Sequence, residues 1–246
     1  MCHTLWKEKV KLLSVSRQTN RQPEIFYSIQ GEGISTGIPA MFLRLAFCNL
    51  RCSWCDTKYT WDWQHYNKQE EVIELSIREI EERLLAQDCR RLIVTGGEPL
   101  IQQKELTNLL ASLKTKGFYI EIETNGTIVP NSNLTWLADQ WNVSPKLENS
   151  GNSLSLREIP EAYDFFISLP SSFFKYVIQT EHDLSEVQGL IDKYGIDKEK
   201  IVLMPEASDR ETLIQRGRWL AKACKDKGYK FSNRLHILLW GNKRGT

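Results

Sequence analysis

The stretch MFLRLAFCNLRCSWC, residues 41–55, determines how the whole chain is interpreted. Its first half, residues 41–47, is an apolar run typical of a buried strand, and it leads directly into three cysteines with the spacing C-x3-C-x2-C. At this spacing Cys48, Cys52 and Cys55 can bind one 4Fe-4S cluster within a single loop. Three thiolates for four irons leave one iron open to another ligand. The stretch therefore predicts an iron–sulfur site at the end of a strand.

The same cysteines are compatible with a structural zinc site. Zinc needs a fourth ligand, and the candidates are Cys2, His65, Cys89 and Cys224. Zinc sites usually come as paired C-x2-C knuckles, and the sequence holds no second pair. The spacing favours an iron–sulfur cluster, with zinc as the alternative.

Outward from the cysteines, short apolar runs alternate with amphipathic stretches, a pattern typical of β-α units around a mostly parallel sheet. We expect a helix from Asn67 whose apolar stripe is Ile73, Ile77, Ile80 and Leu84. A strand is expected at 91–95, a helix at 102–116, and a strand at 118–123. Further strands are expected at 141–144, 174–179, 201–204 and 235–239, and helices at 183–193 and 209–227.

The segment FYIEIE, residues 118–123, alternates strictly between apolar and polar residues. If Phe118, Ile120 and Ile122 face covering helices, then Tyr119, Glu121 and Glu123 face the concave side of the sheet. We expect an incomplete (β/α) barrel with functional groups on the loops after its strands.

Composition excludes some functions. The 246 residues suit one domain, and 32 Lys and Arg against 31 Asp and Glu give no general reason to expect a nucleic acid or a membrane as partner. Residues 216–246 carry nine basic side chains against one acid, which is best explained by a solvated helix face and tail, with anion binding as the alternative. The N-terminus lacks the apolar segment of a signal peptide or membrane helix, so we expect a soluble, cytoplasmic protein.

A second motif, Thr95-Gly96-Gly97-Glu98-Pro99, follows the next strand. With the cysteine loop, it resembles the radical S-adenosylmethionine (SAM) superfamily, in which such a turn binds the methionine moiety through backbone groups. Within the superfamily the sequence resembles the 7-carboxy-7-deazaguanine synthase family. The matching segments are 26–33 (FYSIQGEG), 37–40, 42–44, 55–61, 122–127 and 143–146, with a looser match at 203–205 and 234–241.

The resemblance implies a carbon–nitrogen lyase of queuosine or 7-deazapurine biosynthesis. Its reaction converts 6-carboxy-5,6,7,8-tetrahydropterin to 7-carboxy-7-deazaguanine with loss of ammonia. A 5′-deoxyadenosyl radical formed from SAM abstracts a hydrogen at carbon 6, and the ring contracts. The resemblance further implies a 4Fe-4S cluster, SAM, Mg²⁺, an electron donor of the flavodoxin or ferredoxin type, and a homodimer.

Site roles follow from the same resemblance. Substrate contacts are expected from Ile29, Gln30, Gly31, Arg44 and Thr95. Arg44 suits the substrate carboxylate, and Glu123 is expected to hydrogen-bond the substrate and steer the radical intermediate. Trp54, Cys55, Asp56, Gly97, Ser144, Pro145, Lys146 and Gln179 are expected at SAM, and Thr57 at Mg²⁺.

These residues also have structural explanations. Thr57 suits a turn or helix cap, and Glu123 a salt bridge. Trp54 could shield the cluster, Lys146 could lie on the surface, and His236 could be packed in an apolar run. Two segments depart from the family pattern: an N-terminal extension, residues 1–22, and a basic C-terminal segment, residues 228–246, expected to close the site.

Two other functions compete. A glycyl-radical-enzyme activating enzyme has the same cysteine spacing but acts on a partner protein. Gln30, Arg44 and Thr57 favour a small carboxylated heterocycle over that partner. A metal-stabilised RNA-binding module would use the basic tail, and it predicts zinc and salt-sensitive binding.

Overall fold

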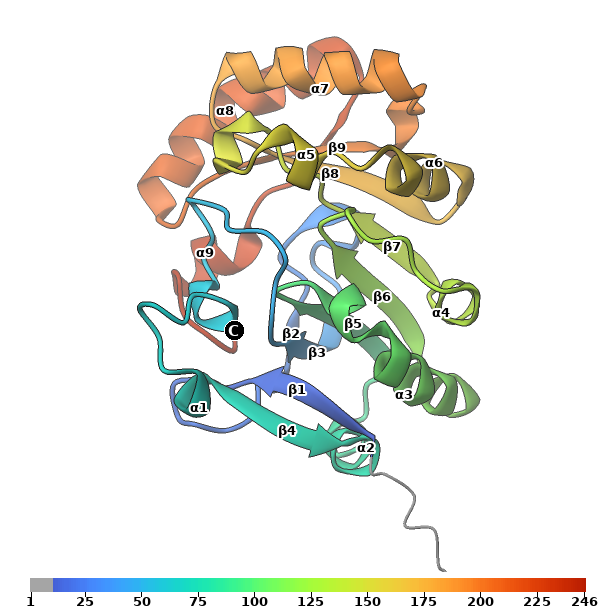
Figure 1. Ribbon diagram of the computed structural model, residues 1–246. Helices are drawn as coiled ribbons and strands as arrows, with labels where there is room; N and C mark the ends of the chain where they lie inside the picture. The colour runs from blue at the N-terminus through green and yellow to red at the C-terminus, as the bar shows by residue number, and fades with distance from the viewer. Residues whose placement is uncertain (1–10) are drawn as a thin grey trace, which may run out of the picture.

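The computed structural model describes residues 11–246, and their strands form one twisted sheet (Figure 1). The order across the sheet is β10-β9-β8-β7-β6-β5-β3-β1-β4, with β2 also paired to β3. From β3 to β10 neighbouring strands are parallel, whereas β1, β2 and β4 pair in antiparallel fashion. The strands are β1 (Leu12–Ser16), β2 (Ile25–Ile29), β3 (Pro39–Leu45), β4 (Val72–Ser76), β5 (Arg91–Gly96), β6 (Tyr119–Thr124), β7 (Gln140–Val143), β8 (Ser172–Ile178), β9 (Ile201–Pro205) and β10 (Lys230–Phe231).

Most of the helices cover the outer face of this sheet (Figure 1), whereas the last one, α9 (Leu235–Trp240), packs against the loop after β2, where the Leu235 N–H donates to the Gly31 carbonyl. The other helices are α1 (Lys68–Glu71), α2 (Ile77–Leu85), α3 (Gln103–Thr115), α4 (Ser132–Leu137), α5 (Leu154–Arg157), α6 (Pro160–Ser168), α7 (Glu181–Tyr194) and α8 (Arg210–Lys227). The predicted incomplete (β/α) barrel is confirmed, because parallel strands alternate with helices and the sheet does not close. None of the helices within residues 11–246 combines the length and apolar character needed to cross a membrane.

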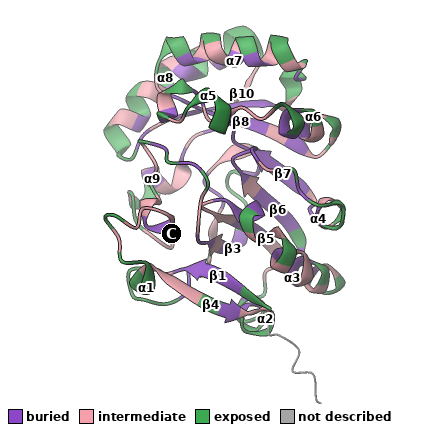
Figure 2. Ribbon diagram, in the orientation of Figure 1, coloured by how far each residue is buried: buried purple, intermediate pink, exposed green. Residues whose placement is uncertain are grey.

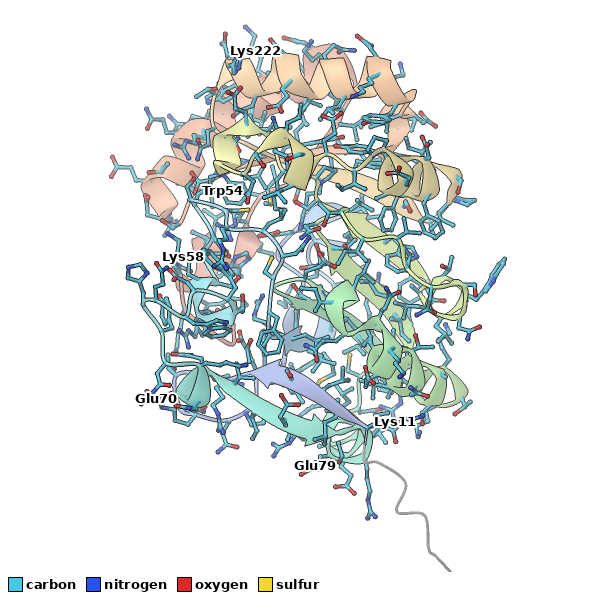
Figure 3. The ribbon with its side chains drawn as sticks, viewed as in Figure 1. Lys11, Trp54, Lys58, Glu70, Glu79 and Lys222 are labelled. Atoms are coloured by element: carbon cyan, nitrogen blue, oxygen red, sulfur yellow. The ribbon has the colours of Figure 1, made fainter. Side chains whose placement is uncertain are left out.

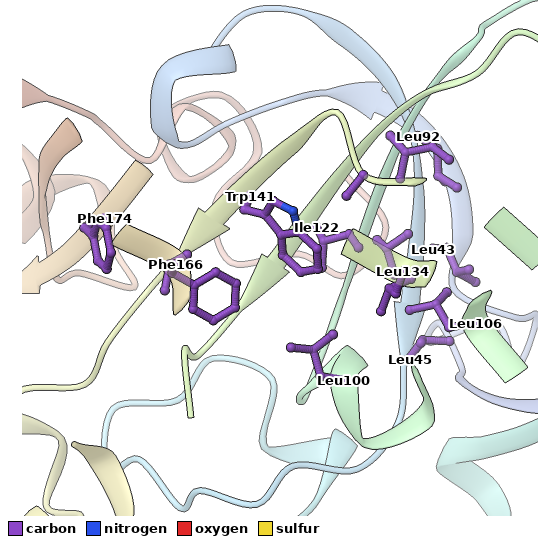
Figure 4. Close-up of a cluster of buried hydrophobic side chains, with 14 of the residues drawn as sticks. Leu43, Leu45, Leu92, Leu100, Leu106, Ile122, Leu134, Trp141, Phe166 and Phe174 are labelled. Atoms are coloured by element: carbon purple, nitrogen blue, oxygen red, sulfur yellow. The ribbon is translucent and has the colours of Figure 1, made fainter. Parts of the chain in front are cut away.

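The main core lies between the strands and the helices outside them (Figures 2 and 4). Alternate strand residues, such as Leu43, Val94, Ile122 and Trp141, are fully or almost fully buried in this core. Their neighbours point to the inner face, because successive side chains of a strand alternate between faces. The expectation for residues 118–123 is confirmed, since Ile120 and Ile122 lie in the core.

The predicted continuous helix from Asn67 is wrong. Asn67 does cap a helix by accepting from the Gln69 N–H, but α1 is only one turn long. Ile73 then lies in β4, where it pairs with Val15 of β1. A new helix, α2, begins after Ser76, which forms a capping box with Glu79. The apolar stripe therefore comes from two elements, because β1 supplies strand pairing that the local sequence could not reveal.

Two terminal segments also differ from expectation. Residues 12–16 of the predicted N-terminal extension form β1, an internal strand between β3 and β4; residues 1–10 lie outside the described part. The strand expected at 235–239 is instead helix α9. Only Ile237 of this helix is fully buried, whereas Leu239 and Trp240 stay exposed, so the apolar run suits one face of a short helix.

Candidate active site

Strand register brings five polar side chains to the inner face of the barrel. Arg44 of β3 pairs with Thr95 of β5, and Glu123 of β6 pairs with Asn142 of β7. Lys175 occupies the inward-facing position of β8, between the core residues Phe174 and Tyr176. Four of the five line a cavity of about 240 Å³, and Asn142 lies beneath them, hydrogen-bonded to Glu123.

The cysteine loop enters this cavity through a constrained backbone. Phe47, directly before Cys48, has φ 73°, a conformation that non-glycine residues rarely adopt. Gly97 packs against this turn so tightly that a Cβ there would lie 2.1 Å from the Phe47 carbonyl oxygen and 2.9 Å from the Cys48 Cβ. The glycine motif and the cysteine motif therefore form one unit, held by the Glu98 N–H donating to the Phe47 carbonyl at 2.7 Å. Such local strain is typical of functional sites.

Each cysteine sulfur accepts a hydrogen bond from nitrogen. Cys48 Sγ accepts from the Leu50 N–H at 3.4 Å, Cys52 Sγ from Asn152 Nδ2 at 3.3 Å, and Cys55 Sγ from Trp61 Nε1 at 3.4 Å. Nitrogen donors around cysteine sulfur stabilise the negative charge of a metal-bound thiolate and tune cluster potentials. Burial raises the pKa of the Cys48 thiol to about 12. Burial thus makes the Cys48 thiolate costly to form, and metal binding removes this cost because a coordinating thiol is deprotonated.

The described residues do not support the zinc alternative. His65 binds Asp62, Cys89 lies near the Pro39 carbonyl, and Cys224 near the Lys230 carbonyl; none of the three lines the cavity. Cys2 lies outside the described residues. No three His, Cys, Asp or Glu side chains within residues 11–246 are grouped closely enough to hold one ion. A cubane suits the cysteines better, since each thiolate binds a different iron and the sulfurs lie farther apart than around one zinc.

Glu98 of the glycine turn is a structural anchor. It is fully buried and accepts hydrogen bonds from the Asn125 N–H at 2.7 Å, the Thr124 hydroxyl at 2.9 Å and the Leu100 N–H at 3.0 Å. Burial raises its pKa, although these donors act in the opposite direction. Glu98 thus ties the ends of β5 and β6 together beside the cysteine loop.

Glu123 lies at one end of a chain of alternating charges. Its Oε1 accepts from Asn142 Nδ2 at 2.9 Å and Gln30 Nε2 at 3.1 Å, and its Oε2 accepts from Lys175 Nζ at 2.9 Å. Lys175 also donates to Glu32 at 2.7 Å. Arg234 donates to Glu32 Oε1 at 3.0 Å and to Asp56 beside the cysteine loop.

Arg44 is oriented by a buried carboxylate. Its Nε donates to Glu24 at 2.9 Å, and Glu24 also accepts from the Tyr59 hydroxyl. Burial would lower the pKa of Arg44, but the charge of Glu24 outweighs it, so the pKa lies above its ordinary value. No described residue within 11–246 bonds to the two terminal nitrogens of Arg44, so its fork remains available to a carboxylate in the cavity.

The C-terminal segment folds back toward the segment that follows the cysteine loop (Figure 1), and several of its residues line the cavity. The Leu235 N–H donates to the Gly31 carbonyl at 2.9 Å, and His236 and Thr246 line the cavity. Arg244 stacks 3.4 Å above the Tyr59 ring and pairs with Glu71 at 2.7 Å. By contrast, Lys222 on the outer face of α8 is exposed (Figure 3), as expected for a solvated basic helix face.

Most of the predicted site residues therefore share this cavity. Trp54 lies on the side of the cysteine loop next to α5 (Figure 3), where its Nε1 donates to Asn149 at 3.1 Å. Lys146 is turned toward the Ser144 hydroxyl, at 2.9 Å, and lies 5.8 Å from the Trp54 ring. The cavity is lined by Ile29, Gln30, Gly31, Arg44, Cys48, Cys52, Trp54, Cys55, Asp56, Thr57, Thr95, Gly97, Glu123, Ser144 and Lys146.

Two predicted residues lie outside this lining. Pro145 is not part of it, although both its neighbours are. Gln179 also lies outside, because its side chain turns to Glu206 at 3.4 Å, and Glu206 itself reaches the cavity. Gln179 is the first residue after β8, where its backbone N–H donates to Asp183 at 2.6 Å at the start of α7.

Sequence reasoning missed Lys175, Asn142, Glu32 and Arg234 as site residues. A signal existed for Lys175, since a lysine inside the apolar strand FFKYVI must be paired if the strand is buried. Arg234 and Glu32 gave no comparable local signal, because 202 residues separate the two partners.

Comparison with known proteins supports this description. The model of the Radical SAM superfamily matches residues 43–141. The 7-carboxy-7-deazaguanine synthase of Pyrobaculum aerophilum is 39% identical over 224 residues, covering 90% of this chain and 95% of the relative. That of Escherichia coli K12 is 28% identical over 235 residues, covering 88% and 96%. The crystal structure of QueE from Escherichia coli superposes with a TM-score of 0.68 at 25% identity, covering 92% of this chain and 95% of that one.

An incomplete barrel with a three-cysteine loop packed on a glycine turn defines a radical SAM enzyme, a class that uses a 4Fe-4S cluster and SAM. The similarity to the relatives extends over nearly the whole chain. The chain belongs to the 7-carboxy-7-deazaguanine synthase family.

Proposed function

We propose that this enzyme converts 6-carboxy-5,6,7,8-tetrahydropterin to 7-carboxy-7-deazaguanine with loss of ammonia, in queuosine or 7-deazapurine biosynthesis. The observation that carries the proposal is one cavity that joins the three cysteines to Arg44, Gln30 and Glu123. These side chains provide a cation for a carboxylate, an amide for a heterocycle edge, and an ionisable acceptor.

The residues fit the cofactors of the family. Cys48, Cys52 and Cys55 would hold the cluster, and their sulfurs already accept N–H donors. When bound, the cluster and SAM supply a 5′-deoxyadenosyl radical that abstracts a hydrogen from the substrate. Gly97 offers close backbone approach for the methionine end.

The remaining SAM contacts are assigned to residues around the same loop. Trp54, Cys55 and Asp56 lie beside the cysteines, and Ser144 and Lys146 follow β7. Pro145 and Gln179 are assigned to SAM by the resemblance alone, and neither lines the cavity.

Substrate binding is assigned to the opposite part of the cavity. The Arg44 fork would bind the substrate carboxylate, because its Nε is occupied by Glu24 and its terminal nitrogens are available. Gln30, with the backbone of Ile29 and Gly31, would bind the pterin edge, and Thr95 would supply a hydroxyl beside Arg44. Glu123 would hydrogen-bond the substrate and steer the radical intermediate.

Thr57 is assigned to Mg²⁺. Its hydroxyl lies 3.6 Å from the Cys55 sulfur and lines the cavity, so it could serve a hard ion that keeps several waters. Thr57→Ala should lower turnover mainly by raising the Mg²⁺ concentration needed, and Thr57→Ser should restore it. Unchanged Mg²⁺ dependence in Thr57→Ala would remove Thr57 from the metal site.

The proposal also covers the domain organisation, the cellular location, the oligomeric state and the electron donor of the enzyme. We infer one domain over residues 1–246, with residues 228–246 closing the site; Arg234, His236 and Thr246 support this by lining the cavity. We infer a cytoplasmic enzyme that takes electrons from a flavodoxin or ferredoxin, because reduced cysteines and a low-potential cluster suit a reducing compartment. A homodimer belongs to the proposal as well, on the family resemblance alone.

The competing functions receive less support. A glycyl-radical activating enzyme acts on a protein, whereas charged side chains line this small cavity and the C-terminal segment covers it. A metal-stabilised RNA-binding module needs neither the Arg44 fork nor Glu123.

Turnover by the reconstituted enzyme tests the proposal. Protein loaded anaerobically with iron and sulfide receives SAM, a reductant, Mg²⁺ and 6-carboxytetrahydropterin. Formation of 7-carboxy-7-deazaguanine, with ammonia in equal amount, is the expected result. Release of 5′-deoxyadenosine without that product would leave only the class of radical SAM enzyme.

A further inference from the structure

Lys175 is a buried ammonium that the roles assigned above do not use. It lies in the middle of β8, is 5% exposed and lines the cavity. An ammonium buried in a strand is costly unless it is paired. Its Nζ lies 2.7 Å from Glu32 Oε2 and 2.9 Å from Glu123 Oε2. Burial would lower its pKa, but these two carboxylates outweigh burial and raise the pKa above its ordinary value.

Lys175 is the only charged partner of Glu123 among the described residues. The other oxygen of Glu123 accepts from the neutral amides of Gln30 and Asn142. Amide donors fix the direction of a carboxylate but do not compensate its charge, and Glu121 adds a like charge from the same strand. Removing the ammonium would leave Glu123 nearly buried with an uncompensated charge.

Glu32, the second carboxylate partner of Lys175, is itself held in place by other residues. Glu32 accepts from Arg234, which also reaches Asp56 beside the cysteine loop. His236 lies 3.9 Å from Glu32. Burial alone would raise the pKa of Glu32, but Lys175 and Arg234 hold it well below its ordinary value. The ammonium is therefore held from both sides and has little freedom to move.

We propose that Lys175 is a positioning residue that fixes the Glu123 carboxylate in one orientation against the substrate, with Glu32 and Arg234 as its support. This inference rests on the proposed function, because it assigns Glu123 its place in that reaction. The role explains why a charge is buried in an otherwise apolar strand. It also makes a prediction that a packing role alone does not make, namely a new pH dependence of turnover when the charge is removed.

The test is steady-state kinetics of Lys175→Met against pH in the reconstituted enzyme. Product formation should fall by about 100-fold, mainly in kcat, because a small displacement of a reacting group costs about this much. The kcat of the wild type should be flat between about pH 6 and pH 8.5, since Lys175 and Arg234 hold the pKa of Glu32 well below its ordinary value. That of the variant should rise with pH across this range, because the buried Glu32 carboxylate loses the Lys175 charge, one of the charges that lower its pKa. His236, Glu121, Asp56 and Arg44 also face this network, but all are retained in the variant.

Three further variants make the result decisive. Lys175→Arg keeps the charge and should retain the flat profile, whereas Lys175→Gln keeps an N–H donor without charge and should show the same rise as Lys175→Met. Lys114 lies on the outer helix α3 and forms a partly buried ion pair with Asp139. Lys114→Met removes this pair and should change neither kcat nor its pH dependence. Iron content and SAM binding, measured for each variant, should match the wild type.

The outcomes separate this inference from the proposed function. If the wild type forms no product, the proposed function fails. If the wild type forms product and both uncharged variants retain flat profiles, Lys175 is not a positioning residue. A rise of kcat with pH in Lys175→Arg would also overturn the inference.

Discussion

Replacement of Gly97 by alanine tests how closely the glycine turn and the cysteine loop depend on each other. The added Cβ would lie 2.1 Å from the Phe47 carbonyl oxygen, 2.5 Å from its carbon and 2.9 Å from the Cys48 Cβ. Ordinary contacts need well over 3 Å, so the loop must retreat by about 1 Å. Overpacking of this kind costs about 1–3 kcal/mol of unfolding free energy. A shift of about 1 Å in a reacting group reduces turnover by about 100-fold.

The assay measures iron content, SAM binding and turnover after anaerobic reconstitution. Gly97→Ala should load less iron, bind SAM weakly and lose most of its turnover. The matched control is Gly189→Ala in α7, where a Cβ meets nothing within 4 Å, and it should leave all three quantities unchanged. The reasoning is refuted if Gly97→Ala binds iron and SAM like the wild type, because the two motifs would then be independent.

Three other perturbations follow from the contacts described above. Glu24→Gln should raise KM for the pterin and lower the unfolding free energy by about 1–3 kcal/mol, since Arg44 loses its charged partner; unchanged KM would argue against an oriented Arg44. Ser76→Ala should lower the urea midpoint by an amount equivalent to about 1 kcal/mol through loss of the capping box, whereas no change would indicate that α2 begins elsewhere. Acid should destabilise the enzyme through Glu32. The pKa of Glu32 is lower in the folded state than in the unfolded state, so ionised Glu32 adds to the free energy of unfolding above the unfolded pKa of about 4.3. This stabilisation is lost as the pH falls from that value through the folded-state pKa. Urea midpoints between about pH 5 and pH 3 should fall less steeply in Glu32→Gln, and equal slopes would contradict this.

The fold was predictable where local pattern and tertiary packing agree. The alternation in residues 118–123 placed Ile120 and Ile122 in the core and Glu123 on the inner face, because a strand has one orientation relative to its covering helices. Apolar runs after amphipathic helices likewise marked the parallel strands. These signals depend only on the chain near each residue.

Errors arose where distant segments decide the outcome. Ile73 continues a helical stripe, yet the pairing of β1 makes it part of a strand. The run at 235–239 is apolar enough for a strand, but its neighbours place it at the end of the sheet as a helix over the cavity. Periodicity cannot distinguish these cases, because both depend on partners more than 50 residues away.

The sequence predicted the residues of the site better than the residues that hold them in place. The cysteines, Arg44 and Glu123 carry chemistry that a motif reveals, and the cavity gathers them. Lys175 and Glu24 act by pairing with those residues, and their partners come from other strands. Charge pairs of this kind have no fixed spacing in sequence, so only the folded chain identifies them.

The account depends on a cluster held by the three cysteines. Its most direct test is metal and sulfide analysis of protein purified and reconstituted without oxygen, with the electron paramagnetic resonance spectrum recorded after reduction and again after addition of SAM. We predict about four iron and four sulfide ions per chain and a spectrum that changes when SAM binds the open iron. Stoichiometric zinc in place of iron, or a reduced spectrum that SAM leaves unaltered, would contradict the account.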